Sequence, residues 1–152
     1  HAKTSFQCAY PSAAALLHDI ERSREGEHAL QSAREAEKIL KGLGVPVSLS
    51  AKISEAIRTH SHSAGRTPPS LEAKILSDAD KLDAMGAVGI YRAFAFAAER
   101  QVNLPEMLKH FDEKLLRLKD LMHTQSAQKL AQKRHGFMTS YEAQSLELHI
   151  LG

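Results

Sequence analysis

The chain has 152 residues, and 20 lysine and arginine residues against 18 aspartate and glutamate residues give it a formal net charge of +2. This length fits one domain, which buries roughly two thirds of the surface of the unfolded chain. Because the charges nearly balance, neither a nucleic acid polymer nor a membrane is expected as a partner. The single cysteine, Cys8, excludes an internal disulfide bond. Together with the absence of a signal-peptide pattern, it predicts a cytoplasmic protein.

Apolar residues recur at the helical period in every long segment, and no segment alternates between apolar and polar residues as a strand does. In the first half of the chain, helices are expected over Pro11 to Ile20, from His28 to a stop at Gly42, and around the apolar face formed by Ile53, Ala56 and Ile57. A fourth helix is expected from about Leu71, through a bend, to about Arg100. Two more are expected after Pro105 to Leu121 and from about Ser126 towards the C-terminus. The segment from Ser61 to Ser70, which contains Gly65, Pro68 and Pro69, is expected to form a loop. The predicted fold class is all-α, with a single domain over residues 1–152.

Nine histidines stand out in the composition, because histidine is the commonest metal ligand in proteins. The first predicted helix is apolar until it reaches His18 and Asp19, and the sequence then turns polar. An imidazole nitrogen beside a carboxylate oxygen suits Mn, Fe, Co, Ni or Zn. Such a pair at a helix end more often caps the helix or faces solvent, so it is weak evidence by itself.

His60 extends the apolar face of the third predicted helix, so its ring is expected to point inward. From the pattern alone it is either a core histidine that bonds a backbone carbonyl or a metal ligand. His28, at the start of the second helix, is either a partly exposed residue of the first turn or a ligand.

Three aspartates lie close together on the fourth predicted helix, namely Asp78, Asp80 and Asp83. Asp80 follows Leu76 by one turn and borders the apolar stripe, and Asp83 lies one turn further on the same side. A carboxylate that faces a helical core must be paired, metal-bound or protonated. Asp80 is therefore a candidate ligand, whereas Asp78 is expected to be exposed to solvent or to support the site indirectly.

The segments that contain these residues resemble the HD superfamily of metal-dependent phosphohydrolases, in particular its small stand-alone bacterial and archaeal members. The resemblance rests on three blocks in the expected order, and it extends from Ala13 to about Tyr141. The blocks are residues 15–20, which contain His18-Asp19, residues 71–90, which contain Ala79-Asp80-Lys81-Leu82-Asp83, and the C-terminal segments 110–122 and 134–138.

This resemblance implies a helical bundle of the HD-domain type around one or two divalent ions, which are Mn, Mg, Fe, Co, Ni or Zn. The His-Asp doublet carries over to His18 and Asp19, and the distant aspartate ligand carries over to Asp80. Members with two ions add histidines at the places of His28 and His60, with His62 a poorer match. The segment 105–148 would form C-terminal helices that pack on this core.

One difference from the family lies before the doublet. The family's first ligand histidine belongs to an upstream helix, but His1 is the only histidine before His18, and residues 1–10 do not resemble that helix. Either residues are missing from this sequence, or this copy lacks the ligand. The expected activity of the chain depends on which alternative holds.

The resemblance implies an enzyme that hydrolyses a phosphoester or phosphoanhydride of a nucleotide or another small phosphorylated metabolite. Asp19 and Glu21 are the expected catalytic residues. Arg22, Lys81 and His62 are expected to bind the substrate phosphate, since a guanidinium can hold a phosphate by two hydrogen bonds.

Two alternatives use the same residues. One is a phosphodiesterase or pyrophosphohydrolase that acts on signalling nucleotides. The other is a degenerate HD domain that binds or regulates without catalysis. The oligomeric state is open, with a homodimer as one alternative.

Overall fold

The computed structural model describes the backbone of residues 2–21, 28–61 and 66–151, and side chains within residues 10–21, 28–61 and 66–145. Over these ranges the chain forms helices joined by short turns and contains no strand, which confirms the all-α prediction. None of the helices in the described part is long and apolar enough to cross a membrane. The chain divides into two compact units, residues 1–78 and residues 79–152, and each is described by itself.

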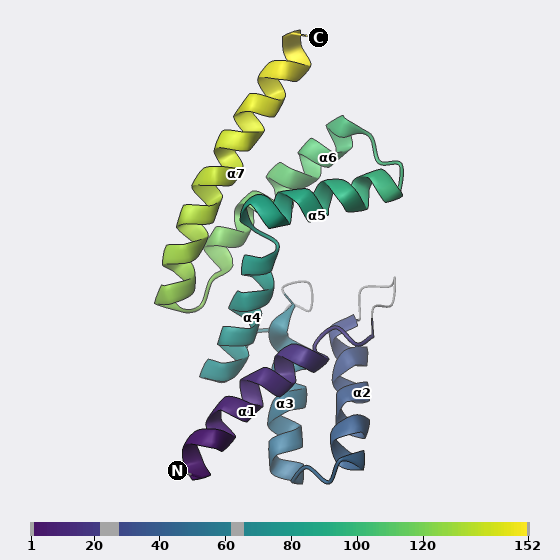
Figure 1. Ribbon diagram of the computed structural model, residues 1–152, viewed down its shortest axis with the longest axis vertical. Helices are drawn as coiled ribbons and strands as arrows, with labels where there is room; N and C mark the ends of the chain where they lie inside the picture. The colour runs from purple at the N-terminus through teal and green to yellow at the C-terminus, as the bar shows by residue number, and fades with distance from the viewer. Residues whose placement is uncertain (1, 22–27, 62–65, 152) are drawn as a thin grey trace. The chain divides into compact units, whose positions relative to one another are not determined.

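Three helices and the first part of a fourth build the first unit (Figure 1). They are α1 (Ala2–Leu17), α2 (His28–Gly42), α3 (Val47–His60) and the part of α4 (Leu71–Asp83) that ends at Asp78. The helices α2 and α3 lie side by side and run in opposite directions (Figure 1). The turn between them contains Gly44 at a φ of 71°, a left-handed conformation that favours glycine and commonly ends a helix.

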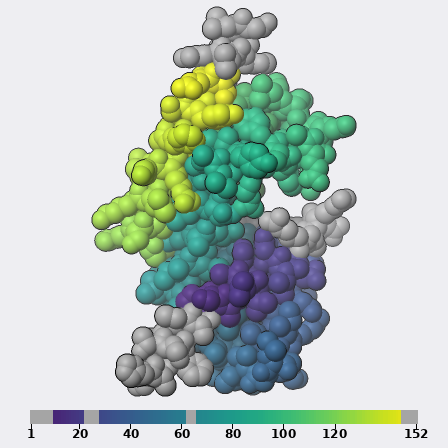
Figure 2. Space-filling model, viewed as in Figure 1, coloured from purple at the N-terminus to yellow at the C-terminus, as the bar shows by residue number. Residues whose placement is uncertain are grey.

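Small residues on α2 allow α2 and α3 to pack closely. Ala33 and Ala36 of α2 and Ile53 and Ile57 of α3 belong to one buried cluster. This cluster also contains Tyr10 of α1, and in Figure 2 the purple atoms of α1 lie directly against the blue atoms of α2 and α3. The predicted apolar face of α3 is therefore confirmed as the centre of this unit.

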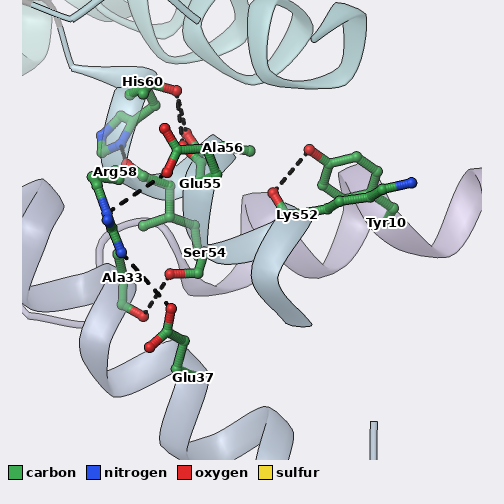
Figure 3. A network of polar contacts seen from close by, with 11 residues as sticks. Tyr10, Ala33, Glu37, Lys52, Ser54, Glu55, Ala56, Arg58 and His60 are labelled. Atoms are coloured by element: carbon green, nitrogen blue, oxygen red, sulfur yellow. Dashed lines mark hydrogen bonds and ion pairs between the residues drawn. The ribbon is translucent and has the colours of Figure 1, made fainter. Parts of the chain in front are cut away.

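Polar contacts reinforce the same packing (Figure 3). The Tyr10 hydroxyl donates to the Lys52 carbonyl at 3.0 Å, which ties α1 to α3. The Arg58 guanidinium lies 3.8 Å from a carboxylate oxygen of Glu37 on α2 and 3.9 Å from one of Glu55 on α3. Because Arg58 and both glutamates are partly exposed, solvent screens these ion pairs and packing is the stronger source of stability.

The second unit contains the end of α4 and the helices that follow it. These are α5 (Gly86–Glu99), α6 (Leu104–His110), a π-helical turn η2 (Phe111–Leu115), a 3-10 helix η3 (Leu116–Leu121) and α7 (Gln125–Leu151). Phe111, Leu115 and Leu118 are buried in its core together with Met138 of α7. Figure 2 shows the green atoms of α5 against the yellow-green atoms of α7 in this unit.

The order of the helices agrees with the sequence prediction, but some details differ. The first helix begins at Ala2 and not at Pro11, so the preference of proline for the first turn predicted too late a start. Leu16, which was placed on the apolar face of this helix, is 81% exposed. The segment after Pro105 is not one regular helix, because apolar periodicity does not distinguish α, π and 3-10 hydrogen bonding.

Candidate metal centre

The His-Asp doublet lies in the turn directly after α1, which ends at Leu17. The His18 Nδ1 atom lies 2.8 Å from the Ala15 carbonyl oxygen, one turn back along the helix. This contact fixes the ring at the helix end. The side chains of His18 and Asp19 are half-buried, so they lie at the boundary between the apolar face and solvent, as predicted.

Two further histidines approach this turn from the ends of neighbouring helices. His28 is the first residue of α2, and His60 is the last residue of α3, where only 1% of its surface is exposed. The centroid of the His60 ring lies 5.1 Å from that of His18 and 5.6 Å from that of His28, in edge-to-face arrangements. The inward orientation predicted for His60 is therefore confirmed.

His60 makes the same backbone contact as His18. Its Nδ1 atom lies 2.6 Å from the Ile57 carbonyl oxygen. Because a carbonyl only accepts hydrogen bonds, Nδ1 of each ring carries the proton, and in the neutral ring the lone pair is on Nε2. Metal-ligating histidines commonly use such a second hydrogen bond to fix tautomer and orientation. The core role and the ligand role considered for His60 are thus compatible.

The doublet and the two helix ends form a group with the chemistry of a metal site. One ligand atom each of Asp19, His28 and His60 lies within 4.8 Å of the others. Two imidazole nitrogens and one carboxylate oxygen suit a divalent transition-metal ion. These three residues therefore fit the ion that the sequence predicted, and all three belong to the first unit.

Two buried serines next to this group were missed by sequence reasoning. The Ser77 hydroxyl donates to the His60 carbonyl oxygen at 2.6 Å, and it connects α4 to the end of α3. The Ser32 hydroxyl bonds the backbone of Glu21, two residues after Asp19. The sequence feature that could have identified Ser32 is its place as a polar residue on an apolar helix face, because it precedes the buried Ala33 and lies one turn before Ala36.

The aspartates of α4 differ in their surroundings. Asp78 is only 2% exposed, so the expectation of simple solvent exposure was wrong. Asp80 is half-buried and follows Ser77 by three residues on the same helix. Asp83 is exposed and forms an ion pair with Arg92, which explains this carboxylate without a metal. Lys81, a candidate for phosphate binding, is buried.

The other candidates have less structural context. Glu21 is exposed in the turn after the doublet. Arg22, His62 and His1 lie outside the described residues. Of the C-terminal histidines, His110 has a pKa lowered by partial burial and, to a smaller extent, by the nearby Lys114.

Comparison with known proteins identifies the family to which the chain is similar. The family model described as HD domain matches residues 12–85. YpgQ of Bacillus subtilis is 48% identical over 91 residues, which cover 57% of this chain and 44% of YpgQ. The alignment thus spans less than half the length of this curated relative.

Solved structures extend the similarity over most of the chain. The crystal structure of Bacillus subtilis YpgQ in complex with ADP matches with a TM-score of 0.72 and 33% identity, covering 91% of this chain and 72% of that chain. An HD-superfamily hydrolase from Bacillus thuringiensis matches with a TM-score of 0.70 and 32% identity, covering 94% and 74%. These matches show that the chain, in which Asp19, His28 and His60 approach one another, belongs to the HD superfamily of hydrolases.

Proposed function

We propose that this chain is a metal-dependent phosphohydrolase that cleaves a phosphoester or phosphoanhydride bond of a nucleotide. The observation that carries the proposal is the approach of Asp19, His28 and His60 to within 4.8 Å of one another through single ligand atoms. Membership of the HD superfamily supports hydrolysis. The crystal structure of YpgQ with ADP supports a nucleotide as the substrate class.

In this proposal His18, Asp19, His28 and His60, which all belong to the first unit, hold one or two divalent ions. A bound ion would lower the pKa of a coordinated water molecule and polarise the phosphoryl oxygen. The chain's contribution is to orient the imidazoles of His18 and His60, which it does through their Nδ1 contacts with backbone carbonyls, so that Nε2 of each ring is the atom available to an ion. Asp19 adds a negative charge that favours retention of a cation.

Residues outside the ligand set are proposed to handle the proton and the phosphate. The exposed Glu21 carboxylate follows the doublet by two residues and can accept a proton from water. Lys81, Arg22 and His62 are the proposed sources of positive charge for the phosphate.

The test is hydrolysis by the purified chain loaded with Mn²⁺, against nucleoside mono-, di- and triphosphates, cyclic dinucleotides and alarmones, with separate detection of phosphate and pyrophosphate. We expect release of phosphate or pyrophosphate from at least one nucleotide and its loss in Asp19→Asn. Asp83→Asn is the matched control, because this exposed carboxylate pairs with Arg92. Failure to release either product from every compound would contradict the proposal.

A further inference from the structure

Ser32 is a buried hydroxyl that bonds the backbone of another segment in both directions. Its exposed fraction is 0%. Its oxygen accepts a hydrogen bond from the Glu21 N–H at 3.1 Å, and its hydroxyl donates to the Glu21 carbonyl oxygen at 3.3 Å. A hydroxyl is suited to this arrangement because it is a donor and an acceptor at once. The side chain of Glu21 is exposed, and both hydrogen bonds of Ser32 go to the backbone of Glu21.

The two segments that Ser32 joins each carry a member of the candidate metal centre. Ser32 follows His28 by four residues on α2, and residues four apart lie on the same face of a helix. Glu21 follows Asp19 by two residues in the turn after α1. A change in the contact between Ser32 and Glu21 therefore alters the spacing of Asp19 and His28, which offer ligand atoms to the same group.

Ser54 provides an internal comparison. It is buried to the same degree, with 1% exposed, and its hydroxyl donates to the Ala33 carbonyl oxygen at 3.4 Å (Figure 3). This bond also connects two helices of the first unit, α3 and α2, but it does not involve the turn after α1 that carries Asp19. Ser54 thus has the burial of Ser32 without its position beside the ligands.

We propose that Ser32 is a positioning residue of the metal centre, which holds the turn that carries Asp19 at a fixed distance from His28. In this role Ser32 acts through the Glu21 backbone and is not itself a ligand of the ion. This inference rests on the proposed function, because it concerns the same site. It predicts that the hydroxyl of Ser32 controls metal affinity more strongly than it controls folding.

The test compares Ser32→Ala, Ser32→Thr and Ser54→Ala with the unaltered chain. Mn²⁺ affinity is measured by electron paramagnetic resonance titration, and exchange of the Glu21 amide proton is measured without metal. In Ser32→Ala we expect Mn²⁺ affinity to fall by about 10- to 100-fold, the range for residues that orient metal ligands, and Glu21 exchange to accelerate. We expect Ser32→Thr, which keeps the hydroxyl, to bind Mn²⁺ more tightly than Ser32→Ala. Ser54→Ala removes an equally buried hydroxyl that does not contact the turn after α1, so its Mn²⁺ affinity should stay within about threefold of that of the unaltered chain.

Several results would contradict the proposal. These are equal loss of affinity in Ser32→Ala and Ser54→Ala, a threonine variant no tighter than the alanine variant, or a Ser32→Ala chain that does not fold. If the unaltered chain binds no Mn²⁺, the proposed function fails. The Glu21 amide then still decides whether Ser32 holds this turn, because faster exchange in Ser32→Ala alone supports the contact and unchanged exchange refutes it.

Discussion

His60→Ala separates the structural role of this buried histidine from its role as a ligand. Alanine removes the hydrogen bond from Nδ1 to the Ile57 carbonyl and the ring contacts with His18 and His28. The hydrogen bond contributes about 1 kcal/mol, and each ring contact contributes about 0.5–1.5 kcal/mol. In the absence of metal, we therefore expect the free energy of unfolding to fall by about 2–4 kcal/mol.

The second effect is the loss of stabilisation by metal. An ion that binds only the folded chain stabilises it by about 2.7 kcal/mol when its concentration is 100 times its dissociation constant. If the loss of His60 weakens binding by about 100-fold, the same metal concentration stabilises the variant by only about 0.4 kcal/mol. The difference of roughly 2 kcal/mol is large enough to measure by urea unfolding followed by circular dichroism.

Ile53→Ala is the matched control on the same helix. Ile53 is 2% exposed in the apolar core of the first unit, and its truncation is expected to destabilise the chain by about 2–5 kcal/mol. Both variants are thus destabilised, but only Ile53→Ala should keep the full increase in stability on addition of Mn²⁺. An equal increase in both variants would refute the assignment of His60 as a ligand.

Three further substitutions test the packing of the two units. Tyr10→Phe removes the bond to the Lys52 carbonyl and should cost about 1 kcal/mol in urea unfolding. Burial raises the pKa of Tyr10 above its usual 10.0, so the unaltered chain should lose stability as the pH rises above about 10 more steeply than the Phe variant does. Gly86→Ala places a side chain at a φ of 76° and should lower the midpoint of thermal unfolding, with a cost of about 1–2 kcal/mol; an unchanged midpoint would contradict the strained conformation. Asn103→Ala removes the cap that accepts from the Glu106 N–H at 2.9 Å, and it should cost about 1 kcal/mol by the same assay.

The sequence predicted most of the helices because each buries an apolar stripe at the helical period. The same periodicity placed His60 on an inner face, where it is 1% exposed, and Asp80 at the boundary, where it is half-buried. Periodicity describes one helix at a time. It therefore gave no indication of the contact between Ser32 and Glu21, which depends on how α1 and α2 lie against each other.

Asp78 and the doublet show a second limit of sequence reasoning. A charged side chain ordinarily favours solvent, but Asp78 is buried, because the packing of its helix decides which face is covered. His18 and Asp19 were expected within a helix and lie just after it, since side-chain patterns locate helix ends poorly. The residue types of the candidate site were predictable, whereas the hydrogen bonds that orient them required the structure.

The most direct measurement is a crystal structure of the chain with Mn²⁺, with the ion located by its anomalous scattering. We predict an ion coordinated by ligand atoms of Asp19, His28 and His60, with Nδ1 of His60 still bonded to the Ile57 carbonyl. A structure at saturating Mn²⁺ with no ion at these residues, or with the ion held elsewhere, would contradict the proposed metal centre.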